Sequence, residues 1–541
     1  MSFKFSVPTA DPIDSGGYVM RAKQAKVWLD TLVGQPLIDS ARGIYAALYG
    51  SNRIRLDDVE RFKLLEVYRE RLYPVLVALS IDFNDVRLPL SETARESANL
   101  SRDLLIEYAY GYKIILLEKA NKLLLFSAKR QLPILLHRAM SALSDLLTLS
   151  YKTYTPTPAG VWHEIHQIYH YAQFHGLHEQ PLDTGRNAEP SSPISLAYKQ
   201  ALLLALADPY RLMPGEVDKV ASIVAQFSGG AIIMPYSAEL AGAGAFLVQS
   251  DSDRAPKALA GATNITPAPI DKVISTVNLS FTLSELIHQL DNGVALKTLA
   301  VPFVGTAAQA SDLLRRLSRA WSLPPKRGFN RQDTASVAEI CAGIQALHHY
   351  LKIQLDPALS AEQARLRSAA TVSLTAVTSG ALGEIRPDYL TSHCEIVNQS
   401  ATGLALRKTP DSKPLVAVGE IIGVKLPGLN SWHIGAARWV QSNDAQEIEL
   451  GIQFLAPSGI PLHIEPASGP LVQKRDALLL PGMEALRQSA TILTPRDTYR
   501  EGMEYKLEHE DRIDRIKATR LVEQTTHFDL FQFIAAYGSS E

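Results

Sequence analysis

The strongest constraint on the fold is a change in hydrophobic period at Pro324 and Pro325. Before these prolines, apolar residues recur at the three- and four-residue spacing of amphipathic helices, whereas after them apolar and polar residues alternate as in half-buried strands. Two successive prolines also end a helix, because the residue before each proline is pushed out of the α region. The 541-residue chain is therefore predicted to be an α+β multidomain protein, with an all-α N-terminal domain followed by β-rich domains.

The N-terminal part has the pattern of long core helices. Leu65, Tyr68 and Leu72 fall on one face of a predicted helix, and a similar apolar face runs through residues 98–130. Two short apolar runs farther on, 231–234 and 245–248, predict a small strand pair inside this helical part. Turn-forming residues mark its limits, and they predict a flexible arm over 1–20 and a mainly α-helical domain over 21–322 with a possible break near 180–195.

The part after the prolines has the pattern of an antiparallel β-barrel. Ile448, Leu450 and Ile452 alternate with Glu447 and Glu449, and four further runs read as strands, namely 395–398, 404–407, 420–426 and 433–440. Closed barrels suit such short strands. We predict a barrel over 323–465, interrupted by an insertion of helical character at 346–390, and a β-rich C-terminal module over 466–541.

Composition and the lack of several sequence motifs argue against several classes of protein. The formal net charge of -2 gives no sign of a nucleic-acid partner. The two cysteines, Cys341 and Cys394, are too few for a disulfide framework and lack the spacing of zinc ligands. The sequence contains neither a signal peptide nor a run of apolar residues long enough to span a membrane, so we expect a cytoplasmic protein. No phosphate-binding loop or nucleophile elbow is present either, and we expect no catalytic residues and no enzyme activity.

Two short motifs carry the functional prediction. Arg327 and Arg331 are separated by three residues directly after the two prolines, and Asn398, Ser400 and Gly403 follow some seventy residues later. An arginine can bind a phosphate with two hydrogen bonds and can also address the N7 and O6 edge of guanine. Gly403 permits either a turn with positive φ or a close approach of two backbones. Together the two motifs suit a ligand that contains both phosphate and guanine.

The two motifs resemble the signature of PilZ domains, bacterial β-barrels that bind the second messenger cyclic di-GMP. In that family an Arg-x-x-x-Arg segment precedes the first strand, and (Asp/Asn)-x-Ser-x-x-Gly follows it. Two later features also resemble the family, the pair Arg438 and Trp439 and the stretch from Gly451 to Phe454. The resemblance covers about a quarter of the chain.

The resemblance implies a role for each site residue. Arg327 would engage a phosphate and a guanine, Arg331 would address a guanine edge, and Asn398 and Ser400 would hold the other base and the ribose-phosphate. Gly403 completes the predicted site, and three further residues are candidates for supporting it, namely Lys326, Arg438 and Gly451. The function implied is that of a cyclic di-GMP effector without a cofactor or a catalytic metal. It would couple nucleotide binding to a rearrangement of domains or to an unidentified protein partner of the helical domain.

Two alternatives concern the barrel. Its first strand could instead be residues 371–377, in which case the preceding arginines would be Arg365 and Arg367, whose spacing does not match the motif. The barrel could also be a protein-interaction scaffold that binds no ligand, because turn chemistry alone accounts for Asn398, Ser400 and Gly403.

A third, less favoured alternative is a metal-dependent hydrolase. His163, His166 and His170 fall on one side of a predicted helix and could bind zinc or iron if a carboxylate arrived from another helix. The aromatic and aliphatic residues between them favour a packed helix with hydrogen-bonded histidines.

Overall fold

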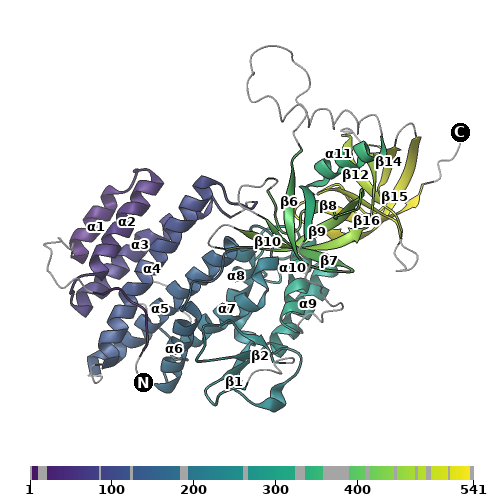
Figure 1. Cartoon of the computed structure of the whole chain (residues 1–541). Coiled ribbons are helices and arrows are strands. Elements are labelled where there is room, and N and C mark those ends of the chain that lie inside the picture. The colour runs from purple at the N-terminus through teal and green to yellow at the C-terminus, as the bar shows by residue number, and fades with distance from the viewer. Residues whose placement is uncertain are drawn as a thin grey trace, which may run out of the picture. The chain divides into compact units, whose positions relative to one another are not determined.

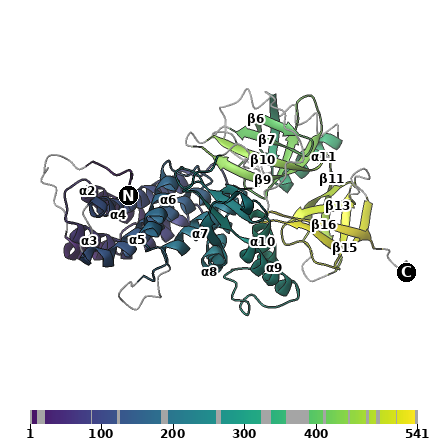
Figure 2. The same cartoon turned by 90° about the horizontal axis from the view of Figure 1, so that it is seen from below.

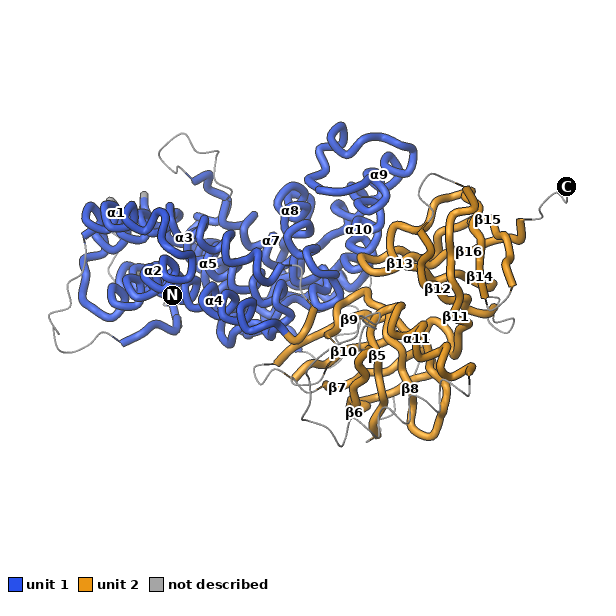
Figure 3. The backbone as a smooth tube through the Cα atoms, turned by 90° about the horizontal axis from the view of Figure 1, so that it is seen from above, with its two compact units in different colours: residues 1–86, 90–326 blue, residues 87–89, 327–541 orange. Residues whose placement is uncertain are grey.

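The computed structural model describes most of the chain as two compact units. Unit 1 comprises residues 1–86 and 90–326, and unit 2 comprises residues 87–89 and 327–541 (Figure 3). The residues described are 3–9, 21–84, 87–121, 126–182, 193–259, 266–322, 336–356, 389–408, 413, 415–443, 447–468, 473–482, 489–509 and 512–536.

Unit 1 is an array of helices around one continuous apolar core (Figure 1). Its helices are α1 (Ala22–Thr31), α2 (Leu37–Asn52), α3 (Asp58–Ser80), α4 (Glu92–Asn121), α5 (Phe126–Lys152), α6 (Val161–Phe174), α7 (Ile194–Leu206), α8 (Glu216–Phe227), α9 (Val277–Asp291) and α10 (Ala307–Ala320). The predicted apolar face of α3 is confirmed, since Leu65, Tyr68 and Leu72 are all buried. Pro74 does not end this helix and lies inside it.

A four-stranded sheet lies within unit 1, where the sequence predicted a strand pair. Its strands are β1 (Ile232–Pro235), β2 (Ala245–Val248), β3 (Lys257–Ala258) and β4 (Lys272–Ser275), in the order β1-β4-β2-β3. The two predicted runs do form strands, but they do not pair with each other, because β4 lies between them and bonds to both. The sequence did not predict β4, because only Val273 and Ile274 of its four residues are apolar, and so short an apolar run does not mark a strand.

Unit 2 contains two closed antiparallel barrels of six described strands each. The first consists of β5 (Ser336–Ala342), β6 (Thr391–Ser400), β7 (Gly403–Lys408), β8 (Ile421–Lys425), β9 (Trp432–Ser442) and β10 (Ile448–Ala456), in the order β10-β7-β6-β5-β8-β9. The second consists of β11 (Ile460–Pro466), β12 (Arg475–Leu480), β13 (Thr491–Pro495), β14 (Glu504–His509), β15 (Arg512–Gln524) and β16 (Phe528–Ala535), in the order β11-β12-β13-β16-β15-β14. The predicted fold class is confirmed.

Helix α11 (Ile344–Leu355) is the described part of the predicted insertion, between β5 and β6 in sequence. The rest of the insertion, residues 357–388, lies outside the described residues. The helix packs against β5, β8 and β9 of the first barrel and against β11 and β12 of the second. Figure 2 shows it at the first barrel, next to β11. Its Leu347 and Leu351 belong to one apolar cluster with Ile434 of the first barrel and Leu478 and Phe528 of the second. The two barrels therefore share a core.

A buried carboxyl group precedes β8 in unit 2. Glu420 is 1% exposed, accepts a hydrogen bond from the Ala417 backbone N–H at 3.1 Å, and pairs with Arg87 at 2.6 Å. Leu88, the next residue after Arg87, forms an isolated β-bridge with Val416. Burial raises the pKa of Glu420 to about 7, against the opposing influence of the Arg87 charge. The folded state therefore favours the neutral form of this carboxyl group.

The pKa of Glu420 predicts how stability depends on pH. Because the folded-state pKa lies above the unfolded value, the stability linked to this group is fully present below pH ~4.5 and is lost as the pH rises through about 7. Glu420→Gln, which mimics the neutral form, should raise the free energy of unfolding at pH 8.5 by on the order of 3 kcal/mol and leave it nearly unchanged at pH 4.5. Urea unfolding across this range measures the difference. Glu504→Gln, an exposed change on β14, is the control, and an equal gain at both pH values would contradict the prediction.

Candidate ligand-binding site

The hairpin of β6 and β7 carries the second sequence motif. Ser400 is the last residue of β6 and Gly403 the first of β7, and the two are paired across a two-residue turn. The Ser400 hydroxyl donates a hydrogen bond to the Gly403 carbonyl at 3.1 Å, which ties the hairpin end together. The strands thus bring Asn398, Ser400 and Gly403 to one end of the barrel.

Asn398 lies next to an irregularity in β6. The pairing with β7 shifts between Ile396 and Asn398, as in a β-bulge, and such bulges re-aim side chains. The residue is half-buried, and its amide has no hydrogen-bond partner among the described residues. The Asn398 amide is therefore available to a ligand.

Gly403 is required by a close approach of two backbones. A Cβ atom at this position would lie 2.2 Å from the carbonyl oxygen of Ile452 on β10, which no side chain tolerates. Its φ does not fall in the positive region that favours glycine. Of the two roles that the sequence left open, the structure supports the close approach.

The first sequence motif lies outside the described residues, and so do Lys326, Arg327 and Arg331. The described chain resumes at Ser336, which opens β5 and pairs with Ile396, two residues before Asn398. Because β5 and β6 are antiparallel, the chain enters β5 at the end of the barrel where the β6–β7 hairpin lies.

Strand β5 has a neighbour on each side in the first barrel. Strand β5 bonds to β6 on one side and to β8 on the other, and the described strands close the barrel around it. Among the described strands, β5 is therefore the first of the barrel, and it directly follows the segment that contains Arg327 and Arg331 in sequence. The alternative first strand at 371–377, with Arg365 and Arg367, lies outside the described part of the chain.

Comparison with protein-family models matches three consecutive parts of the chain. Residues 245–382 and 356–461 match the middle PilZ domain of the cyclic-di-GMP receptor FimW. The part of the chain that forms the first barrel is thus similar to a PilZ domain. Residues 23–236 match the N-terminal domain of the same receptor, and residues 465–536 match its C-terminal β-barrel domain.

A curated relative aligns with nearly the whole chain. The cyclic-di-GMP receptor FimW of Pseudomonas aeruginosa is 26% identical over 578 aligned residues, which cover 95% of this chain and 90% of the relative. The names of this relative and of the models for the N-terminal and middle domains describe a cyclic-di-GMP receptor. Among the described helices, none is both long and apolar enough to cross a membrane.

Arg438 and Gly451, which also resemble residues of the PilZ family, make contacts within and between the barrels. The guanidinium of Arg438 donates to Glu523 of the second barrel, at 2.9 Å in one of two hydrogen bonds, and to Gln453 on β10 at 2.8 Å. A Cβ atom at Gly451 would lie 1.8 Å from Nε1 of Trp439. Arg438 therefore links the two barrels, and Gly451 leaves room for the indole. The sequence could not reveal the first role, because Glu523 lies 85 residues away from Arg438.

The histidines of α6 are arranged for packing. His166 is buried, and its two ring nitrogens bond to the Tyr198 hydroxyl at 2.7 Å and to the Arg254 carbonyl at 3.0 Å. Burial lowers its pKa to about 4. His163 lies 3.9 Å from an exposed carboxylate, that of Asp251. Within the described residues, the α6 histidines form no group compact enough to hold a metal ion, which agrees with the packed-helix interpretation.

The glycine at the hairpin gives a direct test of the site geometry. Gly403→Ala should lower the free energy of unfolding by about 1–3 kcal/mol, because the new methyl group must displace the β10 backbone. Gly242→Ala is the matched control, since a Cβ atom there meets nothing within 4 Å. Chemical unfolding of both variants measures the difference, and equal stabilities would contradict the close approach.

Proposed function

We propose that the chain is an effector that binds cyclic di-GMP at the β6–β7 end of its PilZ barrel. The pairing of Ser336 with Ile396 carries this proposal, because it brings the start of β5 beside Asn398. Arg331 precedes Ser336, the first residue of β5, by only five positions in the sequence. This closeness in sequence supports a site formed by both motifs at this end of the barrel.

The chemistry of the residues matches the ligand. Arg327 and Arg331 supply two planar guanidinium groups for the phosphates and for a guanine edge of the nucleotide. Asn398, with its unpartnered amide, addresses the second base, and Ser400 contacts the ribose-phosphate. Lys326 adds positive charge beside the phosphates. Arg438 and Gly451 support the site indirectly, through the contacts that hold β9 and β10 in place.

The place of the arginine motif suggests how binding is transmitted. The boundary between the two compact units falls between Lys326 and Arg327. A ligand that engages Arg327 and Arg331 stabilises one conformation of the segment that joins the units and so shifts the equilibrium between two arrangements of the chain. The helical domain then passes this state to a protein partner.

Calorimetry with cyclic di-GMP on the full chain tests the binding site. We expect saturable binding by the wild type and a loss of about 30-fold or more in affinity for Arg331→Ala, since loss of a charge-assisted two-bond contact costs about 2 kcal/mol or more. Asn398→Ala should weaken binding as well, by about tenfold. Arg512→Ala, an exposed arginine on β15 that pairs with Asp514, should leave the affinity unchanged.

The same titration separates the proposal from the ligand-free scaffold. No binding heat from the folded wild type would favour the scaffold. Binding that is unaffected by both Arg331→Ala and Asn398→Ala would place the nucleotide elsewhere.

Hydrogen exchange tests the proposed coupling. Saturation with cyclic di-GMP should slow amide exchange across residues 318–335, because a ligand held by Arg327 and Arg331 opposes local opening of the chain around them. Residues 37–52, which form α2 in the helical unit, are the internal control and should exchange at the same rate with and without ligand. Unchanged protection across 318–335 at saturation would rule out this stabilisation.

A further inference from the structure

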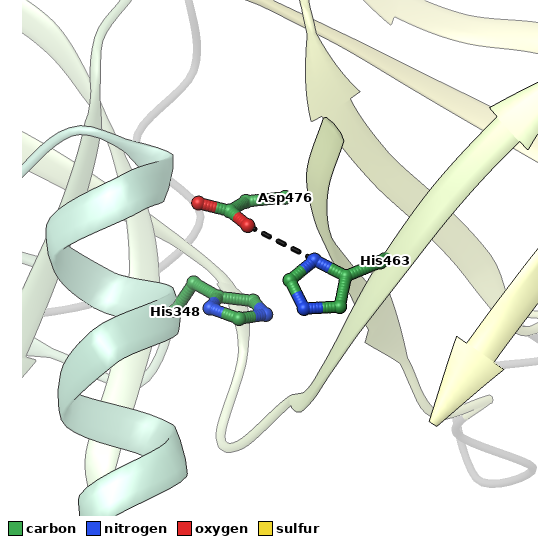
Figure 4. Close-up of side chains that lie close together, drawn as sticks. All are labelled: His348, His463 and Asp476. Atoms are coloured by element: carbon green, nitrogen blue, oxygen red, sulfur yellow. Dashed lines mark ion pairs between the residues drawn. The ribbon is translucent and has the colours of Figure 1, made fainter. Parts of the chain in front are cut away.

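Three side chains of types that can bind a metal ion lie close together, and none of them belongs to the predicted nucleotide site. His348 lies on α11, His463 on β11 and Asp476 on β12, and one ligand atom from each lies within 4.8 Å of the others (Figure 4). We propose that these residues bind a divalent transition-metal ion of the Zn²⁺ type. Neither the PilZ family resemblance nor the nucleotide proposal involves any of the three.

The arrangement of the three side chains is close to that of a zinc site. His463 Nδ1 lies 3.0 Å from Asp476 Oδ1, and the two imidazole rings have their centroids 5.1 Å apart. Tetrahedral zinc with bonds of about 2.0–2.1 Å holds its ligand atoms roughly 3.3 Å apart. The His463–Asp476 edge already has nearly this length, and the remaining edges need to shorten by at most roughly 1.5 Å, which side-chain rotation supplies.

His348 is held as a metal-bound histidine usually is. The side chain is 7% exposed, and its ring makes a hydrogen bond to the backbone of Leu462. Histidine ligands commonly donate their second ring N–H to a backbone carbonyl, because this bond sets the tautomer and aims the other nitrogen at the ion. In Figure 4, His348 on its helix faces His463 on its strand, with the carboxylate of Asp476 beside them.

A cavity adjoins the three side chains and gives access to an ion. It has a volume of about 370 Å³ and is lined by both imidazoles and by Lys352, Asp356 and Glu508 among others. A water molecule in this cavity can complete the tetrahedral coordination. Two imidazoles and one carboxylate suit Zn²⁺, whereas Mg²⁺ and Ca²⁺ prefer oxygen ligands alone.

The bound ion would brace the two barrels. In sequence, helix α11 lies between β5 and β6 of the first barrel, whereas β11 and β12 belong to the second barrel. An ion held by His348, His463 and Asp476 therefore cross-links the insertion of the PilZ barrel to the C-terminal barrel.

Metal titration of the full chain tests this site. After the protein has been stripped with a chelator, Zn²⁺ is titrated in competition with a chromophoric chelator, and Co²⁺ is titrated while the visible spectrum is recorded. We expect one ion per chain, tetrahedral Co²⁺ bands without thiolate charge transfer, and a higher Tm with Zn²⁺ but not with Mg²⁺. His463→Gln and Asp476→Asn should each lower the Zn²⁺ affinity by at least about 100-fold.

Two control variants distinguish this site from other histidines. His393→Ala changes an exposed histidine on β6, and His163→Ala changes α6, so both should keep full Zn²⁺ affinity. A Tm of the metal-free His463→Gln variant close to that of the metal-free wild type shows that the variant folds. The proposal is wrong if the wild type binds no Zn²⁺, which would leave His463 and Asp476 as a simple ion pair. It is also wrong if stoichiometric binding survives both His463→Gln and Asp476→Asn.

Discussion

The close packing of β10 against its two neighbours is the constraint on which the first barrel depends. Strand β10 pairs with β7 on one side and with β9 on the other, and this pairing closes the barrel. Gly403 lets the β10 backbone approach at the carbonyl of Ile452, and Gly451 leaves space for the Trp439 indole. Without these glycines the strands would be held apart, and the hairpin that presents Asn398 and Ser400 would move with them.

The second barrel is bound to the first by both apolar and polar contacts. The shared core joins residues of α11, β9 and the second barrel. Two polar contacts also join the barrels. Arg438 forms an ion pair with Glu523, and the Thr525 hydroxyl donates a hydrogen bond to the Gly419 carbonyl at 2.8 Å. Arg438 also donates to Gln453, which pairs with Gly403, so the contact between the barrels extends to the strand beside the proposed nucleotide site.

A long insertion separates the two halves of the PilZ motif in the sequence. Its described part, α11, packs against both barrels, and the strands on either side of it in sequence, β5 and β6, pair directly. A long insertion is therefore compatible with an intact site, because the two strands that flank it in sequence, β5 and β6, still pair with each other. The proposed metal ligand His348 lies on this helix, so an ion there would fix the insertion without touching the nucleotide.

Sequence alone determined the features that depend on local pattern. The change of period at Pro324 and Pro325 predicted the transition from helices to strands. The residue types of Asn398, Ser400 and Gly403 predicted a strand end and a turn, which the structure shows as the β6–β7 hairpin. Periodicity and turn chemistry could reveal these features because they act between residues close in the chain. Only the tertiary structure decided that β4 separates the two predicted strands, that Gly403 serves a backbone approach, and that His348 meets His463 and Asp476. Each of these depends on contacts between residues distant in sequence, which no local pattern records.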